Sequence, residues 1–284
     1  MALTGTEYTE FAPTAIYKTI ECGGYALSLS TESFGVFDPG TNTSQAFGWP
    51  TYYAYFLGAW SHAGKVWTSF AWYGYSPTYF VSVDPASGLV VTKTTFGGAV
   101  YAGIGDYLFS SSNKVYRIST DTTMTVAGVD RGIPAAGSGR LFGAVGTTLT
   151  ELSPDTSLTI GSSWTLPLAP WGWGRAAGTK IYWGTGVAAT PVVGFDTATD
   201  TPFAVAATPA GFPQYDTNNI EWTPHSDGYL YRRTNVYGGI TPKLTIIDPA
   251  TGRWANEDSP SGRNIGPGVA SIGAKLYVSA DTRS

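Results

Sequence analysis

The strongest constraint on the fold of this chain is a segment that occurs twice in succession without a gap. Residues 102–127 align with residues 136–161 at an offset of 34, with seven identical positions and four more that stay apolar. Each copy contains a glycine turn, a short apolar strand, a loop, a second strand with an aspartate after it, and a last strand. Such internal repeats are typical of folds in which one supersecondary unit packs on the next.

A turn motif with the same chemistry recurs along the whole chain. It is written "IIDPATGRW" at residues 246–254 and "SVDPASGLV" at residues 82–90. The aspartate carboxylate can accept a hydrogen bond from the backbone two residues on, proline presets φ, and glycine adopts a positive φ. We therefore expect each motif to be a hairpin with a type I turn and a bulge. The recurring aspartates are Asp38, Asp84, Asp121, Asp155, Asp196 and Asp248.

A short apolar strand precedes each of these hairpins. It is written "GYALS", "GKVWTS", "GDYLFS", "GRLFG", "GTKIYW", "DGYLYR" and "GAKLYVS", starting at residues 24, 64, 105, 139, 178, 227 and 273. The seventh copy reaches the end of the sequence before an aspartate turn follows it. The sequence therefore has seven copies of this strand but six aspartate turns. This difference indicates that the last unit needs strands from another part of the chain.

Repeats of roughly 40 residues with four strands each are typical of β-propeller blades. We expect an all-β chain that forms one domain over residues 1–284, a seven-bladed β-propeller. Residues 268–279 would supply the inner strands of the seventh blade, and residues 6–13 its outer strand. Pairing the two ends in one blade would cover sheet edges that otherwise invite aggregation. Six blades with an accessory hairpin is the alternative.

The recurring Ile/Val-Asp-Pro-x-Ser/Thr-Gly hairpin resembles that of kelch-like and quinoprotein-like propellers. In those families the hairpin joins the two outer strands of a blade, so the resemblance implies the same place here. The paired glycines and the downstream tryptophan of true kelch repeats are not regular in this chain. The resemblance therefore implies an architecture, and function has to come from a site.

The connections between units are of two kinds. One set is short, whereas the other is long and aromatic, as in "WTLPLAPWGWG" at residues 164–174. In a propeller these two sets lie on opposite faces, so we expect one elaborated face. Aromatic rings can stack on sugars or fill interfaces, although they also fill gaps between blades. The candidate binding residues are Trp49, Tyr52, Trp72, Tyr73, Tyr75, Trp171, Trp173, Tyr215, Trp222 and Tyr237.

Composition narrows the classes of partner. Charged residues are 13% of the chain and the net charge is −4, so there is no basic stripe for nucleic acid. We expect no membrane insertion, because the apolar stretches are interrupted by Gly, Ser and Pro, and the N-terminus lacks the pattern of a secretory signal. The one cysteine, Cys22, is expected to be a small buried thiol.

Catalytic and cofactor motifs are absent from the sequence. There is no Gly-x-Ser-x-Gly elbow, no His-Glu-x-x-His or Cys/His metal cluster and no phosphate loop. His62 and His225 are expected to be hydrogen-bonded structural residues in short turns. Asp216 and Glu221 are a weak candidate for the carboxylate pair of a glycoside hydrolase, and the oxygen-rich residues 215–219 are a weak calcium candidate. We expect no catalytic residues, no bound metal and no cofactor.

Two functional hypotheses follow. The first is a non-catalytic recognition or assembly module, because few charges, many aromatics and no export signal make the chain similar to bacteriophage virion proteins of the tail. That resemblance implies a virion location, several copies, and contact of the aromatic face with host-surface carbohydrate or a neighbouring virion protein. A free cytoplasmic lectin is a variant. The second hypothesis is a propeller enzyme, a glycoside hydrolase or lyase, which needs charged groups that converge at the axis.

Overall fold

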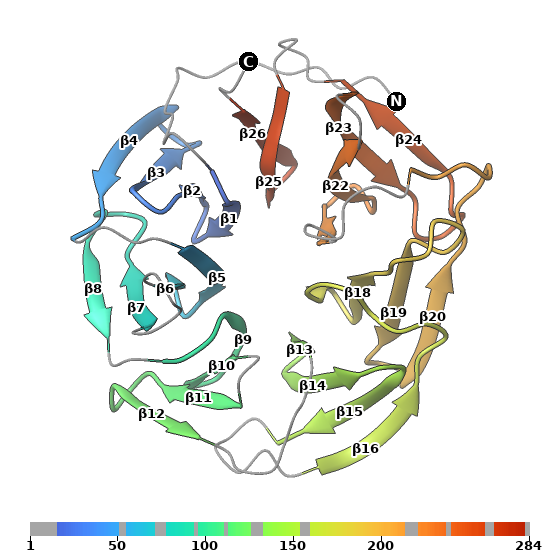
Figure 1. Cartoon of the computed structure of the whole chain (residues 1–284), viewed down its shortest axis with the longest axis horizontal. Coiled ribbons are helices and arrows are strands. Elements are labelled where there is room, and N and C mark those ends of the chain that lie inside the picture. Colours follow the sequence, from blue (N-terminus) through green and yellow to red (C-terminus); the bar gives the residue numbers. More distant parts are fainter. Residues whose placement is uncertain are drawn as a thin grey trace.

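The computed structural model describes residues 16–50, 55–71, 78–93, 96–110, 113–125, 133–153, 160–213, 221–236, 240–258 and 264–281. These residues form strands and turns, with no helix among them. The strands make six antiparallel four-stranded sheets and one two-stranded sheet. The sheets stand around a central axis like the blades of a propeller (Figure 1), which confirms the predicted fold class.

Each sheet is a meander whose strands follow one another in chain order from the axis outward (Figure 1). The first, innermost strands are β1 (Lys18–Cys22), β5 (Tyr55–His62), β9 (Val100–Ile104), β13 (Ile133–Gly137), β17 (Arg175–Ala177), β21 (Thr223–Pro224) and β25 (Asn264–Ile272). The second strands are β2 (Tyr25–Leu29), β6 (Lys65–Ala71), β10 (Tyr107–Ser110), β14 (Arg140–Val145), β18 (Lys180–Gly184), β22 (Leu230–Val236) and β26 (Lys275–Asp281).

Six sheets continue with two more strands. The third strands are β3 (Ser33–Asp38), β7 (Thr78–Val83), β11 (Lys114–Arg117), β15 (Thr148–Leu152), β19 (Val192–Asp196) and β23 (Ile240–Ile247). The outer strands are β4 (Thr43–Gly48), β8 (Val90–Lys93), β12 (Thr122–Thr125), β16 (Ile160–Thr165), β20 (Thr201–Val205) and β24 (Trp254–Glu257). We number the blades 1 to 6 in this order and call the sheet of β25 and β26 the seventh sheet.

The innermost strands close the ring. Each contacts the innermost strand of the next sheet, and β25 contacts β1 as well as β21, so the seventh sheet lies between blade 6 and blade 1. The structure thus has six complete blades, the number in the alternative prediction, and a two-stranded sheet at a seventh position. The predicted closing strand, residues 6–13, lies outside the described residues.

The seven predicted copies of the short apolar strand are the second strands of the seven sheets. Each of these strands begins just after a tight turn that contains a glycine with a positive φ, for example Gly64 or Gly139. The short turn sets the register of the second strand against the innermost strand. Second strands are packed on both faces, as in β6, whereas the outer strand β4 is almost entirely exposed. The second strand β6 is therefore far more buried than the outer strand β4.

Separate apolar clusters fill the spaces between neighbouring blades. Between blades 1 and 2, Leu27 and Phe34 pack with Phe70, and between blades 2 and 3, Trp67 packs with Leu108. Similar clusters lie at each interface up to that between blade 6 and the seventh sheet. Each fully buried aromatic side chain in these clusters stabilises the fold by about 2–3 kcal/mol through the burial of apolar surface. The blades are therefore held together mainly by the packing between them.

The aspartate turns form as expected in four places. Backbone N–H groups two residues on donate to the carboxylates of Asp38, Asp84, Asp196 and Asp248 over 2.8–3.0 Å. A residue with positive φ closes each turn, for example Gly252 at 73°. Hydrogen bonds from Gly40 N–H and the Thr41 hydroxyl lower the pKa of Asp38, as such bonds favour the ionised carboxylate.

The prediction was wrong for Asp121. This residue lies at the end of the turn before β12, has a positive φ of 52°, and accepts a hydrogen bond from the Tyr116 hydroxyl at 2.6 Å. Asp106, from the preceding turn, instead accepts hydrogen bonds from Ser119. The spacing of aspartates alone could not show this exchange, because Asp is also tolerated in the left-handed conformation. Asp155 lies outside the described residues.

The two copies of the 34-residue repeat match in three strands and differ in the fourth. In blade 3, Lys114 of β11 pairs with Thr125 of β12. The equivalent Thr148 of β15 pairs with Thr165 of β16, and a register shift interrupts that ladder. Outer strands have one neighbour and an exposed face, so their register is weakly specified.

Candidate functional site

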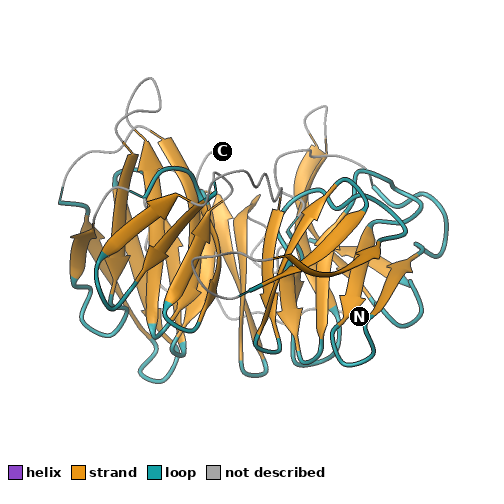
Figure 2. Ribbon diagram, turned by 90° about the horizontal axis from the view of Figure 1, so that it is seen from below, coloured by secondary structure: helices purple, strands orange, loops and turns teal. Residues whose placement is uncertain are grey.

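A pocket of about 380 Å³ opens on the axis at the end of the ring where the innermost strands begin. The innermost strands end at short turns, such as Ala63–Gly64 between β5 and β6, and Figure 2 shows these turns gathered along the opposite face. The pocket is therefore on the face that carries the long connections. Its lining residues are Tyr17, Lys18, Thr19, Phe56, Leu57, Trp173, Glu221, Thr223, Arg232, Arg233, Gly268 and Val269.

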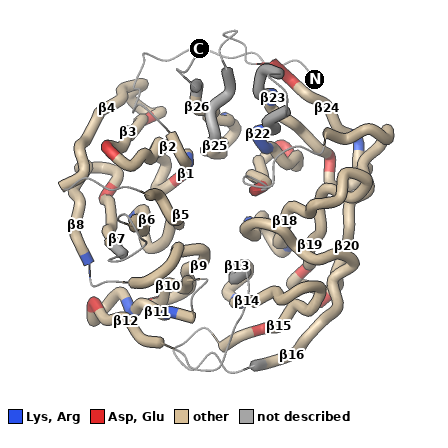
Figure 3. The backbone as a smooth tube through the Cα atoms, viewed as in Figure 1, with Lys and Arg blue, Asp and Glu red and all other residues tan. Residues whose placement is uncertain are grey.

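A buried charge cluster lies in this pocket and joins three blades. Glu221, just before β21, forms an ion pair with Lys18 of β1 at 3.2 Å and contacts Arg175 of β17. The Lys18 ammonium also lies 4.3 Å from the centre of the Trp173 ring, and the Arg175 guanidinium lies 4.5 Å from that of Trp60. Three blades thus bring charges of both signs together near the axis. Figure 3 shows charged positions both there and along the rim of the propeller.

Burial and mutual attraction set the ionisation of this cluster. Burial lowers the pKa of Lys18 to about 8, since the Glu221 carboxylate offsets only part of the desolvation and Arg175 adds repulsion. Burial would raise the pKa of Glu221, but Arg175 and Lys18 outweigh it and leave that pKa below its usual value. Glu221 is thus an anion at neutral pH, and Lys18 is a cation close to its titration point.

A third cation, Arg232 of β22, is held in place by aromatic rings. Its guanidinium lies 4.9 Å from the centre of the Phe212 ring and 4.7 Å from that of Trp222, and it donates to the Pro213 carbonyl at 3.3 Å. Cation–π contacts of desolvated arginine are worth about 2 kcal/mol. Arg232 therefore contributes positive charge from a fixed position in the wall of the pocket.

Aromatic side chains form the apolar part of the pocket. The Tyr17 ring stacks on Phe56 with centroids 5.9 Å apart and planes 15° apart, and Tyr17 remains 45% exposed. Trp173 packs on Tyr101 with centroids 4.7 Å apart. A cavity with an exposed ring beside buried charges can hold a ligand that has both an apolar face and polar groups.

The predicted aromatic residues fall into three groups. Trp49 and Trp222 are buried, and their indole N–H groups donate to the carbonyls of Ser30 and Pro191, so these rings fill the core. Trp173 lines the pocket, and Trp171 is 47% exposed outside it. The others, Tyr52, Trp72, Tyr73, Tyr75, Tyr215 and Tyr237, lie outside the described residues, as do Asp216 and residues 215–219.

Sequence analysis singled out Glu221 as a candidate carboxylate, but it missed Lys18, Tyr17 and the convergence of charges on the axis. It placed no convergent charged set at the inner strands, yet the structure brings Lys18, Arg175 and Glu221 together there. A signal was present, because Lys18 stands inside the apolar stretch "AIYKTI" and Arg175 begins a blade, in a chain with few charges. Their convergence depends on the closure of the ring and could not be read from spacing.

Both histidines lie where the sequence placed them and link blades. His62 Nε2 is 2.9 Å from the Gly105 carbonyl of blade 3, and His225 Nδ1 is 2.6 Å from the Ser271 hydroxyl of the seventh sheet. Their expected structural role is therefore confirmed. Cys22 is buried, as predicted, and burial raises the pKa of its thiol.

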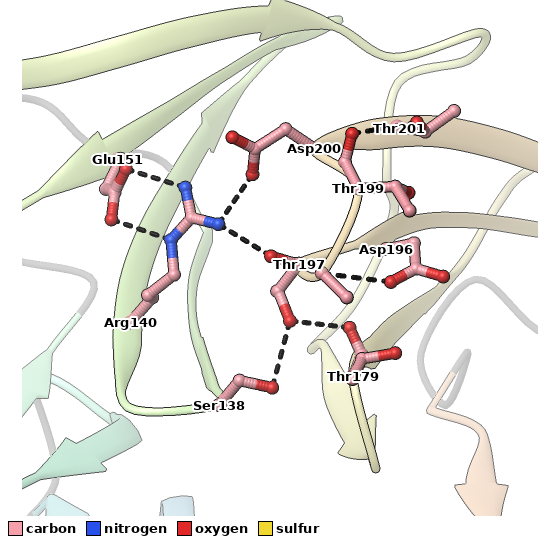
Figure 4. A network of polar contacts seen from close by, with 10 residues as sticks. Ser138, Arg140, Glu151, Thr179, Asp196, Thr197, Thr199, Asp200 and Thr201 are labelled. Carbon is pink, nitrogen blue, oxygen red and sulfur yellow. Dashed lines mark hydrogen bonds and ion pairs between the residues drawn. The ribbon is translucent and has the colours of Figure 1, made fainter.

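A second charge cluster lies on the face with the short turns (Figure 4). Arg140 of β14 makes two hydrogen bonds of 2.8 Å to the Glu151 carboxylate and reaches Asp200 at 2.5 Å and the Thr197 carbonyl at 2.9 Å. Thr197 in turn bonds Ser138. The cluster joins blade 4 to blade 5, and each guanidinium nitrogen of Arg140 has an oxygen partner, so we interpret it as a structural tie.

Among the described residues, no group of three or more His, Cys, Asp or Glu side chains is arranged to hold a metal ion. The same part of the chain has no helix with the length and apolar character needed to cross a membrane.

Comparison with known proteins supports the fold alone. No known family profile and no curated protein matches the chain. Among solved structures, it is similar to the computationally designed Ika8 protein, with a TM-score of 0.57 and 9% identity over 94% of both chains. It is also similar to PorZ, described as an essential bacterial surface component of the type-IX secretion system of Porphyromonas gingivalis. There the TM-score is 0.57 and the identity 12%, over 94% of this chain and 36% of PorZ.

Proposed function

We propose that this protein is a non-catalytic recognition module whose axial pocket binds a saccharide. The observation that carries the proposal is the pocket itself, where the exposed Tyr17 ring lies beside the buried polar groups of Lys18 and Glu221. Sugars present apolar faces and hydroxyl groups together, which such a site can contact at once. Strands of several blades, among them β1, β5, β22 and β25, contribute residues to its walls.

The proposed setting is a bacteriophage virion, in which the propeller is a tail-associated structural protein. The support is the composition, with 13% charged residues and many aromatic ones, together with the kelch-like turn chemistry. In that setting the face with the pocket meets host-surface glycan or a neighbouring virion protein. Several copies in one particle convert weak sites into strong attachment.

A glycan array with purified protein tests the proposal. We expect the wild-type protein to bind a defined set of saccharides and Tyr17→Ala to weaken that binding about tenfold, because the ring is the exposed platform of the pocket. Trp171→Ala is the matched control, since Trp171 is equally exposed but lies outside the pocket. Loss of binding in Trp171→Ala alone would move the site to the outer loops. Absence of any glycan signal, with co-purification in a large particle, would leave only the assembly role.

A second candidate function, a polysaccharide lyase, is favoured by the lowered pKa of Lys18. An amine with a pKa of about 8 is partly neutral at physiological pH and can accept a proton. A glycoside hydrolase needs two carboxylates, and Glu221 is the only one that lines the described pocket. Formation of an unsaturated sugar by the wild type, lost in Lys18→Met, would establish the lyase; saccharide binding without turnover would exclude it.

A further inference from the structure

The seventh sheet ends at its second strand in the described part of the chain. It consists of β25 and β26, whereas the six blades each continue with a third and a fourth strand. Figure 1 shows β26 between blade 1 and blade 6, in the place that second strands have in the other sheets. Second strands of the blades pair on both sides, so the outer edge of β26 is of the kind that accepts a further strand.

The sequence of β26 is that of an interior strand. Residues 273–278, "GAKLYV", align with residues 178–183, "GTKIYW", which form a turn and the second strand β18 of blade 5. Ile181 and Trp183 are fully buried there, whereas Val278, which aligns with Trp183, is 37% exposed. In the described structure, β26 therefore has the apolar side chains of a covered strand but less cover than β18.

The neighbouring blades supply apolar walls on both sides of β26. On the side of blade 1, the Phe37 ring of β3 lies 5.4 Å from the Tyr277 ring, measured between centroids. On the side of blade 6, Leu244 and Ile246 of β23 pack with Leu276. A strand added to β26 would continue these two interfaces and bury apolar surface on both of its faces.

The direction of the chain shows why residues 6–13 do not fit the third place of this sheet. Third strands run antiparallel to second strands and end on the face with the short turns, as β19 does. Residues 6–13 lead into β1, which begins on the face with the pocket. After an antiparallel strand, the link from residue 13 to Tyr17 would reach at most about 14 Å. The seven residues of β26 extend about 20 Å.

Residues 6–13 fit the outer place, as the sequence predicts, and this leaves the third place open. Their sequence, "TEYTEFAP", has two glutamates, which suit an exposed outer strand such as β4. The third strand β19, "VVGFD", is instead buried at four of its five residues. Residues 282–284 are fewer than the four to eight residues of the third strands. The terminal segments of this sequence thus do not supply the third strand.

We propose that the outer edge of β26 binds an extended apolar strand of a partner protein, which pairs antiparallel with β26 as the third strand of the seventh blade. In blade 5, Phe195 lies opposite Ile181, the residue that aligns with Leu276. The partner strand should therefore place a large apolar side chain opposite Leu276 and carry apolar side chains on both faces. Backbone hydrogen bonds would give the affinity and these side chains the specificity.

A synthetic peptide of residues 191–197, "PVVGFDT", is the probe, because it contains the strand that pairs with β18. Titration of the labelled peptide with the whole protein, followed by fluorescence anisotropy, should give saturable binding. The control peptide carries Val193→Pro and Gly194→Pro. Neighbouring N–H groups of a strand point to opposite sides, so one of these two faces β26, and its loss should weaken binding about tenfold or more.

Variants of the protein locate the binding. Val278→Lys places a charge where the added strand would bury it, so the peptide should bind about tenfold or more weakly. Val145→Lys is the matched control and should leave binding intact, because Val145 is also an exposed valine of a second strand, β14, in a complete blade. Equal effects of the two substitutions would overturn the proposal.

Hydrogen exchange of the wild type makes the test independent of any variant. The amides of β26 that point away from β25 should exchange fast in the free protein and slowly with the peptide bound. Slow exchange of these amides before the peptide is added would mean that another segment of this chain or a second copy fills the place, and would overturn the proposal. Absence of saturable binding would also overturn it. Neither result bears on saccharide binding in the axial pocket.

Discussion

The two charge clusters of this molecule use the same chemistry in opposite settings. The Arg140 cluster is half-exposed, and each of its guanidinium nitrogens has an oxygen partner from Glu151, Asp200 or the Thr197 carbonyl. The Lys18 cluster is buried on the axis, where the ammonium pairs with the Glu221 carboxylate at 3.2 Å and lies over the Trp173 ring.

The difference teaches how to separate a structural tie from a candidate site. Where all donors are satisfied across a blade interface, the cluster has nothing left for a ligand. Where charges are buried in pairs beside a cavity, the fold bears a desolvation cost that an exposed pair does not. Such costs are common at functional sites.

The largest expected effect is on the stability of the axial cluster. Glu221→Gln should lower the free energy of unfolding by about 3–5 kcal/mol, because it leaves Lys18 and Arg175 buried without their carboxylate. Glu151→Gln is the matched change in the exposed cluster and should cost below about 1 kcal/mol. Urea denaturation of both variants measures the contrast, and equal losses would abolish the distinction between the two clusters.

The next effect is the pH dependence that Lys18 brings. Its pKa is about 8 in the folded protein and 10.5 in the reference state, so the unfolded chain binds more protons between these values. Stability of the wild type relative to Lys18→Met should therefore rise from pH 8 to pH 10.5, by about 3 kcal/mol at most. Denaturation of both proteins across this pH window measures the difference between their free energies of unfolding. A difference that stays constant or falls with pH would contradict the burial of a charged Lys18.

The smallest effect concerns the exposed cluster. Asp200→Asn removes one partner of Arg140 and should cost below about 1 kcal/mol, since Asp200 is half-exposed and Glu151 still holds the guanidinium. The cost should shrink further in 1 M salt, where the Debye length is about 3 Å. Thermal unfolding at low and high salt measures it. A salt-independent loss would mean that Arg140 is effectively buried.

Much of the fold could be predicted because its signals are local. The glycine turn and the apolar stretch after it identified all seven second strands, and the Asp hairpin was placed correctly at Asp38, Asp84, Asp196 and Asp248. The failures occurred where local signals were ambiguous. An aspartate such as Asp121 can occupy either the first or the last position of a turn. The exposed outer strand β16 pairs in a register that differs from the one the repeat predicts.

From the sequence, the candidate site could be assigned only to one face of the propeller and not to particular residues. Long aromatic connections indicated the face on which the pocket lies, but they did not show that Trp49 and Trp222 are core residues. Tyr17 and Lys18 were missed, because their side chains contact Phe56 and Glu221, which belong to other blades. Lys18 stands 203 positions before Glu221 in the sequence.

The sequence by itself determined the strands, the turns and the order of the blades, since hydrogen bonds between neighbouring strands and the φ values of glycine are properties of short segments. Only the tertiary structure decided which side chains meet on the axis. That meeting follows from ring closure, which brings the starts of strands from different blades to one point and buries there the charges of Lys18, Arg175 and Glu221.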